Sequence, residues 1–301
     1  MDLKAAKNAF YSLINSVHAD EKHLFLSWCK TQCSTESSNA YLQLRTIAED
    51  IRSIVPVSAI FPSECVDHSS LIKSEDSVNE PIVHVDSFLF EDEDIDALVE
   101  EGMLSRNYCK SCSSTNIAPI TFISHSASAQ RIEFIFRYLL PDLRHKVFLD
   151  VGSRLGAVLY GAYFCSSAKA ILGVEINKDL CNVQMHIVEK YKLNDRIQII
   201  CEDIFNVPEV ITSSNVIMLN NVFECFMPKE KQQEMWHWLK NTIKSGTLLI
   251  TVPSLEETFS SLQSSPSISD WLQKINFENT EIPEELDDQD LLSEICLYTV
   301  L

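Results

Sequence analysis

The stretch that most constrains the fold is Val147–Asn177, which reads VFLDVGSRLGAVLYGAYFCSSAKAILGVEIN. It begins with an apolar run that ends in Asp150, passes through a turn that holds Gly152 and Gly156, and continues into an apolar helical stretch. A second apolar, strand-like run follows and ends in Glu175. A strand, a turn, a helix and a strand within about thirty residues form one βαβ crossover, so this stretch predicts two neighbouring parallel strands.

The turn and the end of the second strand have features that suit a nucleotide. Gly152 permits a tight turn, and Gly156 lets the start of the helix approach the strand closely. Glu175 stands where a carboxylate can accept hydrogen bonds from both hydroxyls of a ribose. A dinucleotide-binding turn reads G-x-G-x-x-G, and Arg154 replaces its second glycine here. The spacing therefore argues against a nicotinamide-dependent oxidoreductase.

The run Asp150–Gly156, DVGSRLG, resembles the (D/E)-x-G-x-G-x-G motif of class I S-adenosylmethionine-dependent methyltransferases, with Arg154 at the middle glycine. The resemblance implies that S-adenosylmethionine is the cofactor. In that case Asp150–Gly156 holds its methionine part, Glu175 its ribose, and Asp203 its adenine amino group. Arg154 either pairs with the cofactor carboxylate or fills the space that a glycine normally leaves open. We favour its accommodation, because its side chain can point to solvent from a turn.

Several of these residues also have an ordinary structural explanation. Ser126 or Ser128 precedes the central strand at the position that covers the methionine end of the cofactor in this family, yet each is equally suited to cap a helix. Asp203 can cap a helix that begins at Ile204. Asp150 either contacts the methionine amino group or orients the glycine turn. These alternatives stay open on the sequence alone.

The rest of the chain alternates strands and helices, which predicts an α/β fold with a mostly parallel, seven-stranded sheet and helices on both faces. This is the Rossmann-like fold of the class I methyltransferases. Its carboxy-terminal strand pair is expected at Trp271–Phe277 and Ile295–Leu301, with the second as the antiparallel edge strand. The other predicted elements are the strands Ile197–Ile200, Val216–Leu219 and Thr247–Val252 and the helices Lys178–Leu193 and Pro228–Lys244.

Ligands of open α/β sheets bind beyond the carboxyl ends of the strands, and the stretch Asn220–Phe226, NNVFECF, lies there. Asn220 or Asn221 offers an amide carbonyl to an acceptor amine, and Phe223 and Phe226 offer ring faces to a cation. In the same stretch Glu224 is suited to attract or deprotonate a basic acceptor. The alternative is that the two phenylalanines only pack at the strand end.

The combination of VGSRLG, GVE and VIMLNNVF, within residues 120–255, is loosely similar to the non-SET histone lysine methyltransferases, the disruptor-of-telomeric-silencing family. That similarity implies a lysine acceptor on a protein. A lysine must first lose its proton, which costs roughly 4–5 kcal/mol at pH 7. An apolar, aromatic-lined channel lowers this cost because it desolvates the ammonium.

The part before the central strand is predicted to be a helical extension. Apolar spacing indicates short helices over residues 2–53, and prolines interrupt residues 54–85. We therefore expect an extension with an acidic linker over residues 1–104 and the methyltransferase domain over 105–301. Cys109 and Cys112 have the spacing of zinc ligands, with His125 as a third, but no fourth ligand follows; two unconnected thiols are predicted instead of a metal site.

Charge and cysteine content bear on partners and location. The net charge is −19, and the runs Asp86–Glu101 and Glu278–Glu294 each hold eight carboxylates and no Lys or Arg. This makes nucleic acid an unfavourable partner and suits a basic protein, although solvated helix faces or linkers would look the same. No signal peptide or membrane span is evident, and ten cysteines then indicate reduced thiols in the cytoplasm or nucleus.

The sequence thus predicts a methyltransferase that uses S-adenosylmethionine and methylates a protein, with lysine favoured. The alternatives are a catalytically silent module of the same fold that binds a partner, and methylation of RNA or of a small molecule.

Overall fold

The computed structural model describes residues 3–18, 21–33, 36–64, 82–109, 117–223, 226–276 and 294–301. The chain divides into two compact units, Met1–Gln43 and Leu44–Leu301. The first unit holds the helices α1 (Leu3–Ser16) and α2 (Lys22–Cys33) and the start of α3 (Glu36–Arg52). The helical character predicted for residues 2–53 is therefore confirmed for the part of this stretch that the structure describes.

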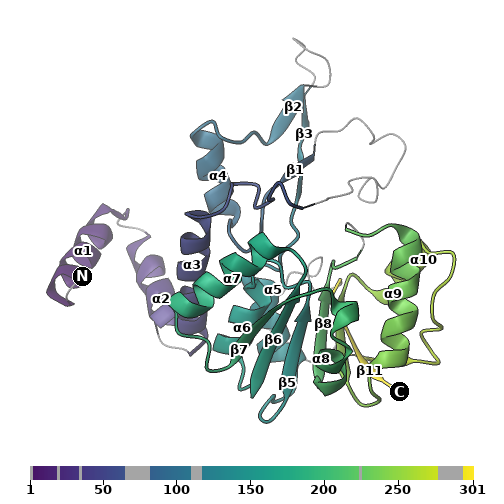
Figure 1. Cartoon of the computed structure of the whole chain (residues 1–301). Coiled ribbons are helices and arrows are strands. Elements are labelled where there is room, and N and C mark those ends of the chain that lie inside the picture. The colour runs from purple at the N-terminus through teal and green to yellow at the C-terminus, as the bar shows by residue number, and fades with distance from the viewer. Residues whose placement is uncertain are drawn as a thin grey trace. The chain divides into compact units, whose positions relative to one another are not determined.

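The second unit is built around a seven-stranded sheet with the strand order β10-β11-β9-β8-β5-β6-β7 (Figure 1). All neighbouring strands in it are parallel except the two pairs that β11 makes with β9 and β10, which are antiparallel. The strands are β5 (Val147–Val151), β6 (Ala170–Glu175), β7 (Ile197–Cys201), β8 (Val216–Asn220), β9 (Leu248–Val252), β10 (Leu272–Ile275) and β11 (Cys296–Val300). The predicted α/β class and mostly parallel seven-stranded sheet are confirmed.

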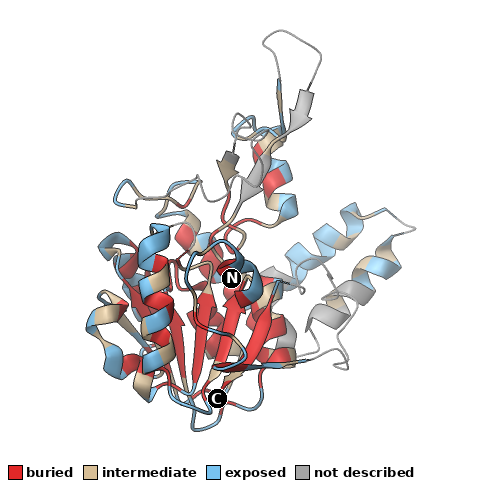
Figure 2. Ribbon diagram, turned by 90° about the vertical axis from the view of Figure 1, so that its right-hand side faces the viewer, coloured by how far each residue is buried: buried red, intermediate tan, exposed pale blue. Residues whose placement is uncertain are grey.

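Helices cover both faces of this sheet because successive strand residues point to opposite sides. Phe148 belongs to one hydrophobic cluster, with the helices that follow β5 and β6, whereas Leu149 belongs to a second cluster with the helices that follow β7 to β9. Figure 2 shows the strands as the buried layer. The first cluster holds α5 (Ala129–Phe134), the π-helical turn η3 (Ile135–Leu139), α6 (Ala157–Cys165) and α7 (Lys178–Lys190); the second holds α8 (Pro208–Ser213), α9 (Lys229–Thr242) and α10 (Leu255–Ser260).

The predicted place of the last strand is wrong. The stretch Ile295–Leu301 does supply an antiparallel strand, but β11 lies between β9 and β10, and β10 forms the edge. The reason lies in the two sequences. In β11 four of five residues are buried, as an interior strand requires, whereas Gln273 and Lys274 of β10 are exposed and suit an edge.

Residues 44–64 and 82–104 pack with the sheet unit. Leu44 and Ile51 of α3 and Phe88 share the hydrophobic cluster that contains Phe148 and Tyr160. The structure therefore divides the chain after Gln43, and the functional boundary expected at residues 104 and 105 stays a prediction. The remaining elements are β1 (Ile82–His84), which pairs in parallel with β4 (Thr121–Ile123), the antiparallel pair of β2 (Asn107–Cys109) and β3 (Ile117–Pro119), the helix α4 (Asp92–Glu100) and the short turn η4 (Ile204–Asn206).

The described residues hold neither a membrane-spanning helix nor a cluster of metal ligands. None of the helices there has the length and apolar character needed to cross a membrane. Nor do any three His, Cys, Asp or Glu side chains of these ranges gather closely enough to hold a metal ion. Cys112, one of the two thiols with zinc-like spacing, lies outside the described residues.

Candidate functional site

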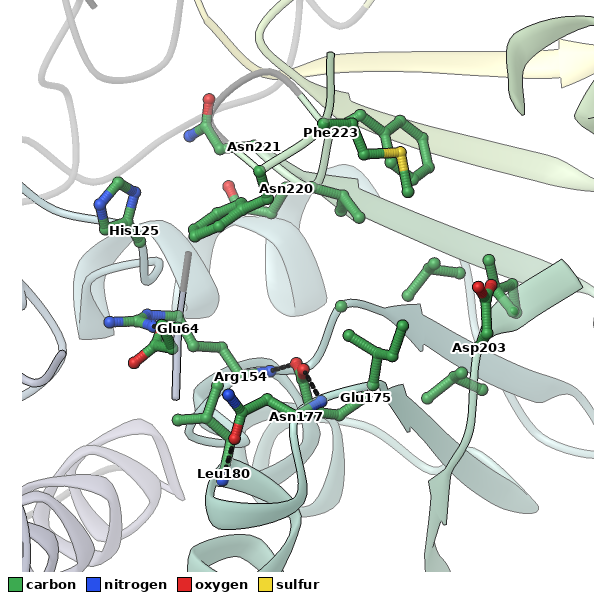
Figure 3. Close-up of a pocket in the computed structure, with 18 of the residues that line it drawn as sticks. Glu64, His125, Arg154, Glu175, Asn177, Leu180, Asp203, Asn220, Asn221 and Phe223 are labelled. Atoms are coloured by element: carbon green, nitrogen blue, oxygen red, sulfur yellow. Dashed lines mark hydrogen bonds and ion pairs between the residues drawn. The ribbon is translucent and has the colours of Figure 1, made fainter. Parts of the chain in front are cut away.

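A pocket of about 400 Å³ opens at the carboxyl ends of the central strands (Figure 3). Its wall includes Gly152 and Arg154 from the turn after β5, Glu175 at the end of β6, Asp203 after β7 and Asn220 at the end of β8. Parallel strands deliver their carboxyl ends to one edge of the sheet, so residues far apart in sequence meet there. The sheet topology thus brings together five of the residues predicted from sequence.

The glycine turn is held in one conformation by its neighbours. Gly152 has φ +70°, its N–H donates to the Val174 carbonyl at 2.8 Å, and a Cβ here would lie 2.9 Å from Cγ1 of Val222. Gln184 of α7 secures the next two residues, because its Oε1 accepts from the Ser153 hydroxyl at 2.9 Å and its Nε2 donates to the Arg154 carbonyl at 2.6 Å. The turn therefore needs glycine at position 152 for both its backbone and its close contact.

Glu175 is placed as a buried acceptor on the pocket wall. Its Oε2 accepts from the Arg154 N–H at 2.9 Å, and its Oε1 accepts from the Asn177 N–H at 2.8 Å. Burial raises the pKa of this carboxyl, and the two backbone hydrogen bonds oppose that rise. Each carboxylate oxygen has a further lone pair, so the group can also accept from the two hydroxyls of a ribose.

Asp203 stands at the opposite side of the pocket from Glu64 and His125, with Glu175 between them (Figure 3). Its Oδ1 accepts from the Phe205 N–H at 3.0 Å and so caps η4, while the residue still lines the pocket. The capping role and the binding role that the sequence left as alternatives are compatible, because a carboxylate has acceptor sites for both. Apolar side chains also line the pocket, namely Val151, Val174, Ile176, Leu180 and Ile204.

The expectation that the Arg154 side chain points to solvent is wrong. Only 8% of the side chain is exposed, and its Nη1 lies 2.6 Å from Oε2 of Glu64. Its Nη2 donates to the Ala59 carbonyl at 2.6 Å, and its Nε lies 3.9 Å from Oδ2 of Asp86. The reason is that the segment before residue 65 folds over the glycine turn and surrounds the guanidinium with acceptors. Arg154 keeps a positive φ, +47°, at the motif's glycine position.

Three residues predicted to contact the cofactor do not line the pocket: Asp150, Gly156 and Ser128. Asp150 is 3% exposed within β5, and burial, with Glu175 as the second cause, raises the pKa of its carboxyl well above the usual range. Gly156 begins α6 with φ +85°. Ser128 caps α5, since its hydroxyl accepts from the Arg131 N–H at 3.2 Å. These residues support the fold beside the pocket, and cofactor contact by any of them stays a prediction.

Four residues of the stretch that is expected to receive the acceptor line the pocket, and their role as an acceptor wall stays a prediction. Asn220, Asn221, Phe223 and Phe226 line the pocket, whereas Glu224 lies outside the described residues. Oδ1 of Asn220 is buried and has no hydrogen-bond partner, which is costly unless a ligand donates to it. Phe223 is almost fully buried and its ring meets Trp236 edge-on, so it packs in the core as well as lining the pocket.

Sequence reasoning missed four polar residues of the wall: Ser63, Glu64, His125 and Asn177. The position of Asn177 could have been predicted, because an asparagine directly before a helical pattern is a typical helix cap. Its Oδ1 accepts hydrogen bonds from the N–H groups of Asp179 and Leu180. His125 was considered only as a zinc ligand; its Nε2 lies 3.1 Å from Nδ1 of His84. Ser63 and Glu64 carried no signal, since the segment that holds them lies far from the motif in sequence.

Comparison with known proteins gives similarity at the level of solved structures. No family model and no curated protein sequence matches the chain. An RNA methyltransferase from Salinibacter ruber in complex with S-adenosyl-L-homocysteine has 18% identity and a TM-score of 0.37, over 54% of this chain and 99% of that chain. An O-methyltransferase from Bacillus cereus in complex with S-adenosyl-L-homocysteine has 14% identity and a TM-score of 0.39, over 60% and 84%.

A precorrin-6y C5,15-methyltransferase from Geobacter metallireducens has 9% identity and a TM-score of 0.40, over 59% of this chain and 90% of that chain. Identities this low leave the activity to be argued from the site. The architecture is plain from the strands themselves. The mostly parallel seven-stranded sheet, with one reversed strand near its end and helices on both faces, is the Rossmann-like fold of class I methyltransferases.

Proposed function

We propose that the chain is an S-adenosylmethionine-dependent methyltransferase that acts on a protein, with lysine as the favoured acceptor. One observation carries the cofactor assignment: Glu175, Asp203 and the Gly152 turn meet in one pocket at the carboxyl ends of β5, β6 and β7. The carboxylate of Glu175 suits a ribose, Asp203 suits an amino group of adenine, and the apolar side chains of the same pocket suit the base.

Methyl transfer from a sulfonium requires little acid–base catalysis by the protein. S-adenosylmethionine supplies a methyl group on a sulfonium, which is already a good leaving group, so the chain must mainly align an acceptor with that carbon. Asn220 is suited to this role, because its buried and unpartnered Oδ1 at the end of β8 accepts a hydrogen bond from an N–H of the acceptor. This contact favours an amine over an acceptor that has no proton to donate.

The choice of lysine among amines rests on the aromatic side chains of the pocket wall and on the charge of the molecule. The aromatic rings of Phe223 and Phe226 on the same wall suit the alkyl chain and charge of a lysine. The loose similarity of residues 120–255 to the non-SET histone lysine methyltransferases points the same way, and it too stays a prediction. The net charge of −19 is complementary to a basic protein.

The test of the cofactor site is thermal unfolding of the full chain with and without S-adenosylmethionine, for wild type and for Glu175→Ala. A ligand at a hundred times its dissociation constant stabilises the folded state by about 2.7 kcal/mol, which raises the melting temperature measurably. We expect this rise in wild type and its loss in Glu175→Ala. Absence of the rise in wild type would refute the proposal.

The acceptor is tested by transfer of labelled methyl groups to cellular fractions. Label that resists nuclease and is released by protease supports a protein acceptor, whereas release by nuclease indicates RNA. Label in the small-molecule fraction would indicate a low-molecular-weight acceptor.

The second candidate is a catalytically silent module that binds a partner. The observation that favours it is the ionic contact of Arg154 with Glu64, which occupies the turn side of the pocket. Absence of cofactor binding, or cofactor binding without any transfer of label, would favour this candidate over the methyltransferase.

A further inference from the structure

Arg154 and Glu64 form a buried ion pair that faces the pocket. The side chains are 8% and 5% exposed, Nη1 and Oε2 lie 2.6 Å apart, and both residues line the cavity. A buried pair is expensive to desolvate, and it is weak evidence of a purely stabilising role. Its position on a pocket wall therefore raises the question of which ligand group it meets.

Both partners keep hydrogen-bonding capacity after their contacts within the chain. The guanidinium has five N–H donors, of which Nη1 serves Glu64 and Nη2 serves the Ala59 carbonyl. The Glu64 carboxylate has four acceptor sites, and its neighbours use two of them, through Arg154 and through the Phe61 N–H at 2.7 Å. The pair can thus offer the pocket a donor and an acceptor of opposite charge side by side.

The segment that carries Glu64 is held in place by hydrogen bonds that do not involve Arg154. The Ser63 hydroxyl donates to Oδ2 of Asp179 at 2.6 Å, and Nδ2 of Asn177 donates to the Ser63 hydroxyl at 3.1 Å. These contacts anchor the residue before Glu64 to the start of α7, directly beside the backbone that binds Glu175. Glu64 is therefore held in a fixed position against the pocket.

The order of groups along the pocket indicates what reaches this pair. Asp203 lies at one side and Glu175 in the middle, while Arg154, Glu64 and His125 lie at the other side (Figure 3). If adenine lies toward Asp203 and ribose at Glu175, the remainder of an adenosyl ligand extends toward the ion pair. In S-adenosylmethionine that remainder is an amino acid, with an ammonium and a carboxylate on one carbon.

We propose that Arg154 and Glu64 together bind the amino-acid end of the cofactor, Arg154 through its carboxylate and Glu64 through its ammonium. This inference rests on the proposed function, since it concerns the same pocket. The zwitterionic amino-acid end adds no net charge to the buried site, and the guanidinium of Arg154 and the carboxylate of Glu64 each gain a further partner of opposite sign. Arg154 at the motif's glycine position is then a binding residue.

The test measures dissociation constants by titration calorimetry on the full chain with two ligands, S-adenosylmethionine and 5′-methylthioadenosine. The second ligand has the nucleoside and the sulfur but no amino-acid end. We expect Glu64→Gln to weaken the binding of S-adenosylmethionine about tenfold, because one charge-assisted contact is lost. The same variant should change the affinity for 5′-methylthioadenosine less than about twofold.

Glu202→Gln is the matched control. It removes the same charge from the same pocket, but Glu202 bonds to the Asp203 N–H and to Nδ2 of Asn206 and makes no contact with Arg154. We expect it to change the dissociation constants of both ligands by the same factor. If Glu64→Gln weakened the binding of both ligands by the same factor, the inference would be overturned. Tighter binding of S-adenosylmethionine by that variant would also overturn it, because Glu64 would then be blocking Arg154.

A measurement on wild type covers the case in which Glu64→Gln does not fold. Decarboxylated S-adenosylmethionine keeps the ammonium and lacks the group assigned to Arg154, so we expect it to bind about tenfold more weakly than the intact cofactor. Equal or tighter binding would refute the inference and leave the proposed function standing. Failure of wild type to bind any of the three ligands would refute the proposed function itself.

Discussion

Arg154 holds a left-handed backbone conformation that costs a residue with a side chain roughly 1–2 kcal/mol relative to glycine. The side chain offsets this cost through its contacts with Glu64, the Ala59 carbonyl and Asp86. Burial raises the pKa of Asp86, and the charge of Arg154 is the largest effect that opposes the rise. Removing Arg154 would leave two buried carboxyl groups without their cation.

We therefore predict that Arg154→Gly, which restores the motif's glycine, destabilises the protein by about 3–5 kcal/mol, the usual cost of breaking a buried ion pair from one side. Urea unfolding at pH 7 measures it. The double variant with Glu64→Gln should recover part of the loss, because the orphaned carboxylate is then gone. Equal or greater stability of Arg154→Gly would show that backbone strain outweighs the ion pair.

The pKa of Glu175 gives the site a pH dependence. Burial raises this pKa, so as the pH falls the carboxylate becomes protonated before an ordinary glutamate, whose pKa is about 4.3. A protonated carboxyl has lost part of its capacity to accept from ribose hydroxyls. As the pH is lowered, calorimetry should therefore show that the affinity for S-adenosylmethionine begins to fall at a pH above the pKa of an ordinary glutamate.

Glu175→Gln is the control for this effect. The variant binds weakly at every pH, and its affinity should not change over the interval in which wild type loses binding. A parallel pH dependence in the variant would assign the titration to another group of the pocket.

At the scale of elements, α3 and α4 are joined by ion pairs on one carboxylate. Asp94 of α4 accepts from Nη2 of Arg45 at 2.7 Å and from Nη1 of Arg52 at 3.1 Å. Burial tends to raise the pKa of Asp94, but the bonds from Arg52 and Arg45 prevail and lower it to about 2. Its ionised form therefore stabilises the folded chain above the unfolded pKa of about 3.9, and this stability is lost as the pH falls through about 2.

We predict that Asp94→Asn lowers the free energy of unfolding at pH 7 by about 1–2 kcal/mol, a range that allows for partial solvent screening. The difference from wild type should shrink between pH 4 and pH 2, which urea unfolding at several pH values measures. Asp96→Asn is the matched control on the same helix, because Asp96 pairs with Arg106 at the surface and its loss should cost less than about 0.5 kcal/mol. Equal losses for the two variants would contradict the prediction.

The sequence predicted elements well where local pattern decides them. Strand-length apolar runs that end in Asp150, Glu175 and Asn220 located β5, β6 and β8, because strands buried on both faces read as continuous apolar runs. It misplaced β11, although the apolar run of β11 and the polar Gln273 and Lys274 of β10 already suit an interior strand and an edge strand. Likewise, the sequence did not predict that Glu64 lines the pocket or that Arg154 is buried. Both result from tertiary contacts between segments far apart in the chain, which leave no local sequence pattern.

At the scale of the whole molecule, the acidic run Asp86–Glu101 serves two purposes. Asp86 is buried beside Arg154 and Asp94 joins two helices, so these carboxylates belong to the fold. Glu91 is half-buried, and the remaining five carboxylates on or beside α4 are exposed, namely Asp92, Glu93, Asp96, Glu100 and Glu101. Most of the second run, Glu278–Glu294, lies outside the described residues. The exposed carboxylates and the net charge of −19 give the molecule a negative field, which suits the basic acceptor that we propose.

A basic acceptor should therefore lose affinity in salt. We predict that the KM for a lysine-containing basic peptide rises several-fold between about 50 and 300 mM salt, since the Debye length falls below about 10 Å in that interval. The dissociation constant of S-adenosylmethionine should change less than about twofold, because charges inside a pocket are screened less. The matched control is the same peptide with its basic flanking residues replaced by acidic ones, which should bind more weakly at low salt and approach the basic peptide at high salt. Equal KM values for the two peptides at low salt would show that the acceptor is chosen by the pocket alone, through Asn220 and its aromatic neighbours, and that the surface charge serves solubility.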